Sequence, residues 1–208
     1  MIASQNSLLF DPLELAEMAN DITLYLRRFG MLNAAEMDVM RQMMHIKTFK
    51  KGSFLLKEGQ IAAHLYCNLK GCVREYYLKD AEEKTINFYT EGDSIAHTSY
   101  ILRAPAKHYL ECIEDTTLTV VSYQNDREFN RRFPRFGSIC NGKTAAELGH
   151  LQEITAEYMV STPEERYQNL VKNRPDLLNR VPQYQLASYI GVTPESLSRI
   201  RNRIRLGN

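Results

Sequence analysis

Between His45 and Tyr123 the chain is a succession of short β-type runs separated by turn residues, with a spacing of about ten residues. HLYCNL and CVREYYL are typical runs, rich in aromatic and β-branched side chains. Their separators contain glycines where a hairpin needs an unusual backbone angle, namely Gly52, Gly59, Gly71 and Gly92. Regular short runs of this kind predict an antiparallel sandwich or barrel of about 80 residues.

Helical patterns lie on both sides of this β-rich region, so the predicted class is α+β. Asn33 followed by Glu36 is a capping-box spacing, and Met37, Met40 and Met44 repeat at helical intervals. We expect a helix over about 33–44, preceded by another over about 12–28. The methionine stripe is interpreted as helix core.

After Asn125 a loose apolar series replaces the β pattern and continues to Tyr158. It predicts a helix pair over 126–160 whose long second member forms a dimer seam. Ser161-Thr162-Pro163-Glu164-Glu165 then supplies an N-cap, a proline at the first helical position and acidic residues in the first turn. The predicted domains are therefore 1–125, the helix pair 126–160, and 161–208.

The last segment, from Val181 to Ile204, has the requirements of a helix-turn-helix. Ala187 is a small residue where two helices would meet, and Gly191 lies four positions later, where the chain would turn. Thr193 is expected to cap the second helix and Pro194 to begin it. Leu197, Ile200 and Ile204 provide its inner face.

The opposite face of that second helix carries groups that can contact bases and phosphates. Residues 161–208 carry eight Lys and Arg against four Asp and Glu, whereas residues 1–160 carry 18 against 21, and this asymmetry favours a polyanion partner. The candidate DNA-binding residues are Gln183, Tyr184, Thr193, Glu195, Ser196, Arg199, Asn202 and Arg203.

The chain resembles the Crp/Fnr family of transcription regulators over nearly its whole length. The resemblance rests on the Lys51-Gly52, Glu58-Gly59 and Lys70-Gly71 turns, on Glu91-Gly92-Asp93, and on the terminal run LASYIGVTPESLSRIR. It implies a homodimer with an N-terminal jelly-roll barrel of the cyclic-nucleotide-binding type and a C-terminal winged helix-turn-helix that reads a palindrome. By the same resemblance, Glu195 and Arg199 match the family's base-reading acid and arginine, whereas Pro194 departs from the arginine of the cyclic-AMP receptor.

The resemblance also places an effector pocket in the barrel, at Ala96, His97, Thr98, Lys107 and His108. This chain lacks the glutamate and the arginine that hold the ribose and phosphate of cyclic AMP, and lysine replaces a bidentate fork with a point charge. No cysteine precedes Cys67, so no iron–sulfur cluster is expected. An anion pocket remains open, as does haem or metal ligation by the histidines. No metal site is assigned, and the effector is unknown.

Other functional classes find little support in the sequence. The five histidines never occur as His-x-His and no Gly-x-Ser-x-Gly is present, so no catalytic residues are assigned and an enzyme is not expected. The four cysteines, Cys67, Cys72, Cys112 and Cys140, are interpreted as isolated buried thiols. No apolar run reaches the length of a membrane helix and the N-terminus does not look like a secretory signal, which predicts a cytoplasmic protein.

The sequence thus predicts a homodimeric, sequence-specific transcription regulator that binds double-stranded DNA and contacts RNA polymerase. A small-molecule effector in the barrel is expected to modulate its DNA binding. The alternative is a cyclic-nucleotide-binding-like or haem- or metal-sensing module that acts through protein partners rather than through DNA.

Overall fold

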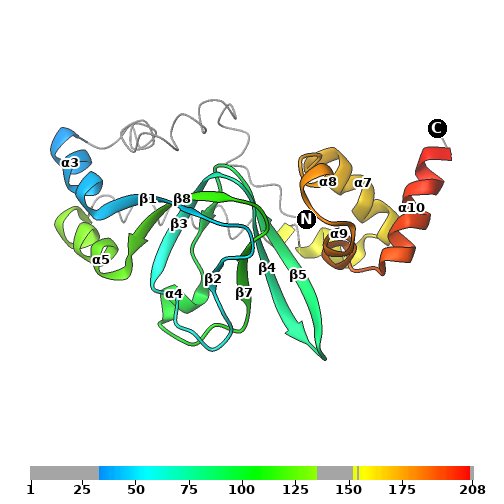
Figure 1. Cartoon of the computed structure of the whole chain (residues 1–208), viewed down its shortest axis with the longest axis horizontal. Coiled ribbons are helices and arrows are strands. Elements are labelled where there is room, and N and C mark those ends of the chain that lie inside the picture. The colour runs from blue at the N-terminus through cyan, green and yellow to red at the C-terminus, as the bar shows by residue number, and fades with distance from the viewer. Residues whose placement is uncertain (1–32, 135–151, 154, 207–208) are drawn as a thin grey trace. The chain divides into compact units, whose positions relative to one another are not determined.

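The structure is a computed structural model that describes residues 33–134, 152–153 and 155–206. Within these residues the strands form two antiparallel sheets of four strands each (Figure 1). One sheet has the order β1 (Met44–Phe49), β8 (Thr116–Ser122), β3 (His64–Lys70), β6 (Ser94–Ile95). The other has the order β2 (Phe54–Leu56), β7 (Tyr109–Cys112), β4 (Val73–Lys79), β5 (Glu82–Tyr89).

The predicted antiparallel β domain is thereby confirmed, but as a β-roll of two sheets rather than as a closed barrel. β8 is an inner strand of the first sheet and has a partner on each side. It runs antiparallel to β1 from Met44 opposite Val121 to Phe49 opposite Thr116, and it also pairs with β3. Strands far apart in the sequence are therefore held together by one continuous ladder.

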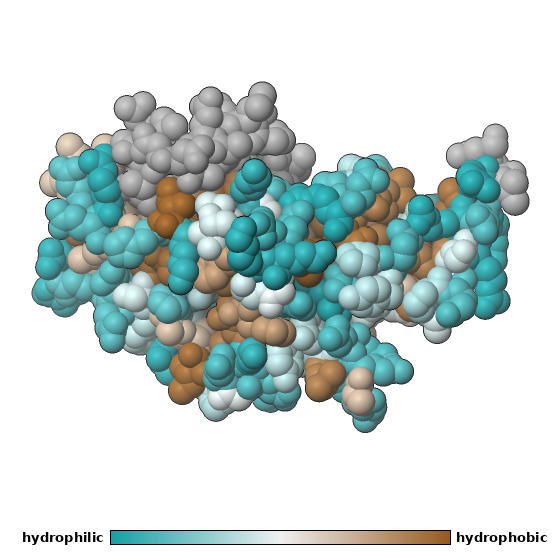
Figure 2. All heavy atoms as spheres, in the orientation of Figure 1, coloured by the Kyte–Doolittle hydropathy of each residue, from teal (hydrophilic) through white to brown (hydrophobic). Residues whose placement is uncertain are grey.

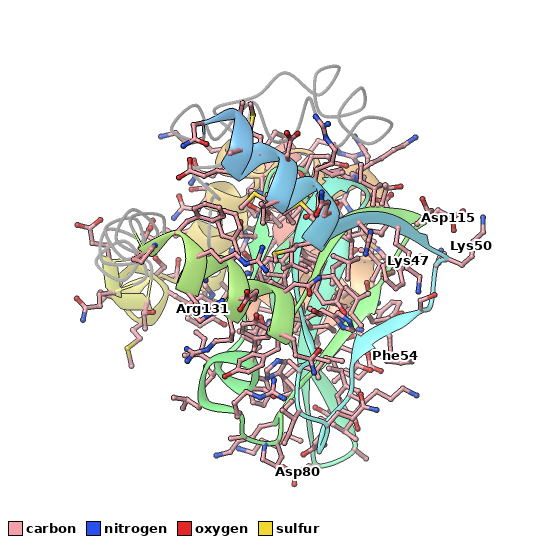
Figure 3. All side chains as sticks on the ribbon, turned by 90° about the vertical axis from the view of Figure 1, so that its left-hand side faces the viewer. Lys47, Lys50, Phe54, Asp80, Asp115 and Arg131 are labelled. Carbon is pink, nitrogen blue, oxygen red and sulfur yellow. The ribbon has the colours of Figure 1, made fainter. Side chains whose placement is uncertain are left out.

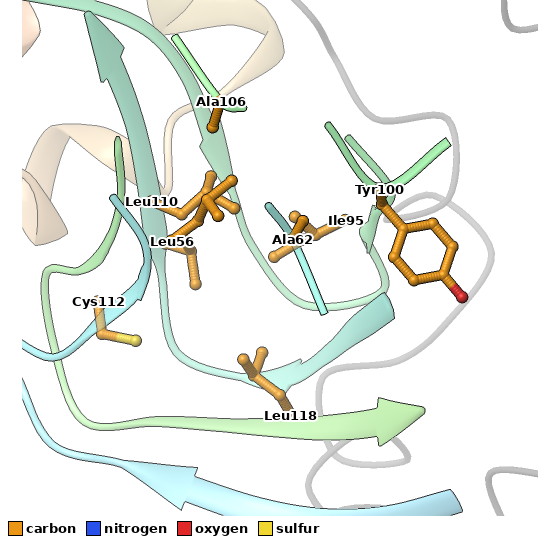
Figure 4. Packing of buried hydrophobic residues seen from close by; sticks show 9 residues of the cluster. Leu56, Ala62, Ile95, Tyr100, Ala106, Leu110, Cys112 and Leu118 are labelled. Carbon is orange, nitrogen blue, oxygen red and sulfur yellow. The ribbon is translucent and has the colours of Figure 1, made fainter. Parts of the chain in front are cut away.

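The core of the β-roll lies between the two sheets. Leu56, Val73, Leu110 and Leu118 are all nearly inaccessible and come from both sheets, which identifies the inner faces (Figure 4). A second cluster joins helix α3 (Ala34–Met43) and helix α5 (Tyr123–Arg132) to the outer side of the first sheet. It contains Met40, Met44, Cys67, Leu69 and Phe129.

The helix predicted at 33–44 is confirmed, including its cap. The Asn33 side chain accepts a hydrogen bond from the Glu36 backbone N–H at 2.9 Å, and Glu36 accepts one from Asn33 N–H at 2.8 Å. Met40 and Met44 are buried, so the methionine stripe is helix core, as interpreted from the sequence. The helix predicted at 12–28 lies outside the described residues.

The long helix predicted within 126–160 lies partly outside the described residues. Within the predicted range 126–160, helix α5 extends to Arg132, and residues 152–153 and 155–160 are also helical. The described cysteines Cys67, Cys72 and Cys112 are buried thiols that form no disulfide with one another, in agreement with their interpretation from the sequence. Among the helices described, none is long and apolar enough to cross a membrane.

The C-terminal residues form four helices: α7 (Pro163–Asn173), α8 (Leu177–Arg180), α9 (Gln183–Ile190) and α10 (Pro194–Leu206). The predicted N-cap before Pro163 is confirmed at Thr162, which in addition forms a capping box with Glu165. The nine residues between α7 and α9 contain α8, and residues 155–206 contain no strand, so the expected wing is not confirmed.

The described residues group into two compact units, one of residues 33–75 and 88–134 and the other of residues 76–87 and 152–206. Their grouping does not test the predicted boundaries at 125 and 160, which stay predictions. In the first of these units, hydrogen bonds between turns form a network at one end of the β1–β8 ladder.

The turn network centres on Asp115, which follows β7. Its carboxylate accepts a hydrogen bond from Lys50 Nζ at 2.7 Å and another from the Lys51 backbone N–H at 3.0 Å (Figure 3). Both hydrogen bonds lower the pKa of Asp115, the bond from Lys50 most. The turn after β1 is thereby tied to the turn before β8, which fixes the end of the ladder at the Phe49–Thr116 pair.

Gly71 occupies the tightest point of this region. Its φ is +103°, and a Cβ there would lie 2.7 Å from the Asp115 carbonyl oxygen and from the Thr116 backbone. Gly52 has a similar φ of +80° but nothing within 4 Å of the position of a Cβ. Both glycines therefore share the left-handed backbone conformation, and of the two only Gly71 adds a steric contact. Comparing substitutions at the two positions distinguishes these two effects.

We expect Gly71→Ala to destabilise the β-roll more than Gly52→Ala. Both variants incur the left-handed penalty of about 1–2 kcal/mol, and only Gly71→Ala adds an overpacking cost of about 1–3 kcal/mol. Equilibrium urea unfolding, followed by tyrosine fluorescence, measures the difference. Equal losses for the two variants would show that the contact at Gly71 relaxes freely.

Candidate functional sites

The interior of the β-roll contains a cluster of titratable side chains. Glu75 lies on β4, His97 precedes helix α4 (Thr98–Leu102) as its N-cap residue, and His108 precedes β7. Their side chains are only 11%, 10% and 6% exposed, respectively. All three belong to the same compact unit.

The three side chains converge on one another. His97 Nε2 lies 3.7 Å from Glu75 Oε2, and His108 Nε2 lies 4.0 Å from Glu75 Oε1. The two imidazole rings are tilted with centroids 4.1 Å apart. Each residue therefore offers one atom to a common point, and these atoms all lie within 4.8 Å of one another.

Burial controls the protonation of the cluster. It raises the pKa of Glu75 to about 7, although a hydrogen bond from Tyr89 opposes the rise. It lowers the pKa of His97 to about 3, with His108 contributing, and it also lowers the pKa of His108. Both imidazoles are therefore neutral at physiological pH, the form in which histidine donates a lone pair to a ligand.

Tyr89, on β5, orients the carboxylate. Its hydroxyl donates to Glu75 Oε2 at 2.8 Å and lies 3.5 Å from His97 Nε2. The cavity that His97 lines has a volume of about 10 Å³. That is room for roughly one water molecule, whereas small-molecule pockets span about 300–1,000 Å³. In this conformation the interior suits a very small ligand.

The predicted effector-pocket residues divide into two groups in the structure. His97 and His108 come together in the interior, whereas Ala96, Thr98 and Lys107 are exposed. Glu75 and Tyr89 are missing from the predicted set. A signal for Glu75 was present, because alternation along β4 places it on the same face as the core residue Val73.

The second candidate site is the pair formed by α9 and α10. Gly191 ends α9 with a left-handed φ of +73°, and Thr193 caps α10 by accepting a hydrogen bond from Ser196 N–H at 3.2 Å. Ala187, Leu197 and Ile200 are buried between the helices and their neighbours. These features agree with the turn, the cap and the inner face predicted from the sequence.

Arg166, on α7, holds the turn in place. Its Nε donates to the Ile190 carbonyl at 2.8 Å, and its Nη1 donates to the Ser161 carbonyl at 2.9 Å. The guanidinium also lies 4.6 Å from the centre of the Tyr158 ring. One side chain thus connects the end of α9 to the beginning of α7.

The predicted DNA-binding residues lie mainly on the outer surface. Figure 2 shows largely hydrophilic atoms over α10. Ser196 is half-buried and the remaining seven are exposed: Gln183, Tyr184, Thr193, Glu195, Arg199, Asn202 and Arg203. Within the described chain, Arg203 pairs with Glu164 at 2.7 Å, and Gln183 accepts a hydrogen bond from Arg201.

Replacing Arg166 tests whether the turn depends on it. We expect Arg166→Ala to destabilise the α9–α10 pair by about 2 kcal/mol or more, because it removes charge-assisted hydrogen bonds to two carbonyls. Lys172→Ala, at an exposed position of the same helix, should change stability by less than about 0.5 kcal/mol. Hydrogen–deuterium exchange of peptides covering α9 and α10 reports the effect. Equal exchange in the two variants would contradict the role of Arg166.

Comparisons with known proteins agree with the β-roll. Residues 46–132 match the family model of the cyclic nucleotide-binding domain. No curated protein sequence matches the chain. Among solved structures, the chain is similar to a CooA mutant from Carboxydothermus hydrogenoformans, with a TM-score of 0.62 and 18% identity over 80% of this chain and 78% of that one.

Two further structures share the fold over most of both chains. FixK2 from Bradyrhizobium japonicum has a TM-score of 0.64 and 19% identity, covering 79% of this chain and 85% of its own. CLP from Xanthomonas campestris, a c-di-GMP-responsive global regulator, has a TM-score of 0.64 and 15% identity, covering 84% and 93%. Residues 46–132 therefore resemble a cyclic nucleotide-binding domain, and the chain is similar in fold to these three proteins.

Proposed function

We propose that the protein is a sequence-specific DNA-binding transcription regulator, in which a β-roll of the cyclic-nucleotide-binding type accompanies a C-terminal helix-turn-helix. It binds a palindromic operator as a homodimer and is not an enzyme. The α9–α10 pair is the observation that carries this proposal. Cytoplasmic location, contact with RNA polymerase and modulation by a small effector belong to the same proposal.

The geometry of α9 and α10 supports the helix-turn-helix assignment. Two short helices meet across Gly191, with the buried Ala187 at their approach. The inner face of α10 is apolar through Leu197 and Ile200, which leaves the opposite face free to enter a groove. A recognition helix needs this division between a packed and an exposed side.

The charges on the exposed face suit base reading. The pKa of Glu195 is lowered by a hydrogen bond from its own backbone N–H, by one from Thr193 and by the charge of Arg199. An ionised Glu195 can accept a hydrogen bond from the cytosine amino group, and Arg199 can donate two to guanine. We assign these two residues to bases in the major groove.

The other members of the exposed set are assigned to the DNA backbone and neighbouring bases. Arg203 is 68% exposed in its pair with Glu164, and surface pairs of this kind contribute about 0–1 kcal/mol. Arg203 can therefore leave the Glu164 carboxylate for a DNA phosphate at a small cost in free energy. Gln183, Tyr184 and Thr193 lie at or just before the helix N-termini, where phosphate contacts are common.

Selection of sites from a random DNA pool by the full-length protein tests the function. We expect an enriched palindrome whose half-sites lie about one helical turn, or 34 Å, apart, because two recognition helices of a dimer enter successive major grooves. The selection is run at a stated salt concentration, since phosphate contacts make affinity depend steeply on salt. Absence of enrichment with no ligand, with cyclic nucleotides and with divalent metal ions would contradict the proposal.

Arg199→Ala tests the base-reading assignment on the selected site. The variant should lose about 1–3 kcal/mol of binding free energy and should relax specificity at one base pair of each half-site. Lys172→Ala serves as the matched control because it removes an exposed positive charge outside α9 and α10. Fluorescence anisotropy with single-substitution operators measures both effects. A uniform loss across all operators would assign Arg199 to a phosphate instead.

A further inference from the structure

We propose that Glu75, His97 and His108 form a binding site for a divalent first-row transition-metal ion in the interior of the β-roll. The inference concerns residues of one compact unit and goes beyond the proposed function, because it holds whether or not the chain binds DNA. Neutral imidazoles and a carboxylate are the ligands that Zn²⁺ and its neighbours prefer.

The spacing of the donor atoms supports the site. Metal bonds of about 2.0–2.2 Å in a tetrahedral arrangement place neighbouring ligand atoms about 3.4 Å apart. His97 Nε2 lies 3.7 Å from Glu75 Oε2 and His108 Nε2 lies 4.0 Å from Glu75 Oε1, and one donor atom from each residue lies within 4.8 Å of the other two. Closing around an ion would require each side chain to move by about 1 Å or less, which torsional adjustment within a rotamer well provides.

The origin of the three donors makes the arrangement specific. They come from β4, from the residue before α4 and from the residue before β7, so three separate segments converge on one point. None of them is an exposed surface group, since all three side chains are about nine-tenths buried. Among the described residues, this is the group of histidine and carboxylate side chains that meets at ligand spacing.

Electrostatics favours a cation at this point. A buried carboxylate beside two neutral imidazoles is costly to ionise in a low-dielectric interior unless a positive charge compensates it. A divalent ion would supply that charge and would keep the carboxylate ionised. The cluster therefore gains more from an ion than an exposed set of the same residues would gain.

The surroundings supply an outer shell and exclude larger ligands. Tyr89 donates to Glu75 Oε2 at 2.8 Å, as outer-shell residues do for ligating carboxylates. The cavity beside His97, of about 10 Å³, accommodates a water molecule but neither a haem nor a nucleotide. An ion held by three protein ligands keeps its fourth position for a water molecule. The small cavity adjoins this point at His97 and is not lined by Glu75 or His108.

Metal titration of the full-length protein, first stripped with a chelator, tests the site. We expect isothermal titration with Zn²⁺ to give one ion per chain, and Co²⁺ to give the visible absorption of a four-coordinate complex. Glu75→Gln, His97→Gln and His108→Gln should each weaken Zn²⁺ binding by about 100-fold or more, and Tyr89→Phe by about tenfold. His64→Ala, a half-buried histidine on β3 outside the cluster, should leave binding unchanged.

Two controls separate ligation from folding. Glu75→Gln is nearly isosteric and keeps an acceptor for Tyr89, so its circular dichroism without metal should match that of the unsubstituted protein. Zn²⁺ should then raise the melting temperature of the unsubstituted protein and of His64→Ala but not that of Glu75→Gln. Mg²⁺ should not compete, because it prefers oxygen ligands and water.

The proposal is overturned if Zn²⁺ shows no saturable binding at micromolar concentration. It is equally overturned if Glu75→Gln binds Zn²⁺ as tightly as His64→Ala does, since the ion would then occupy another site. Both results are independent of DNA binding, so failure of this inference and failure of the proposed function are distinguishable.

Discussion

The space between the two sheets is the constraint on which the β-roll depends. The core between the sheets contains Leu56, Val73, Leu110 and Leu118. These side chains are buried only because both sheets present their apolar faces to the same interior. β8 holds the first of these sheets together, because it pairs with β1 on one side and β3 on the other. The same inward alternation that buries Val73 also buries Glu75, so a stable core and an unusual polar cluster have one cause.

Different physical factors determine the chemistry of the Glu75–His97–His108 cluster and of the α9–α10 pair. In the β-roll, burial sets the chemistry: it keeps both imidazoles neutral and makes an uncompensated carboxylate costly. On α10, exposure sets the chemistry, because solvated charges stay available to a partner and give up their surface pairs at little cost. The described residues thus include a buried polar cluster in the β-roll and a solvated, charged face on α10.

Much of this organisation could be predicted from the sequence where local interactions decide it. The capping boxes at Asn33 and Thr162, the left-handed turn at Gly191 and the cap at Thr193 all depend on residues a few positions apart. The wing was suggested by the family resemblance and not by local sequence signals. In the structure the short segment between α7 and α9 contains the helix α8, and the wing is not confirmed. The strands form two sheets rather than a closed barrel, because closure depends on pairing between strands distant in sequence.

The sequence by itself determined the class of each segment: antiparallel strands with glycine turns, capped helices, and a basic C-terminal region with one apolar and one polar helix face. Only the tertiary structure decided that His97 and His108 meet Glu75 in the interior, whereas Ala96, Thr98 and Lys107 remain exposed. The physical reason is that caps and turns are satisfied by neighbouring backbone groups, which a sequence displays. Convergence of side chains from β4, α4 and β7 depends instead on how the sheets pack against each other.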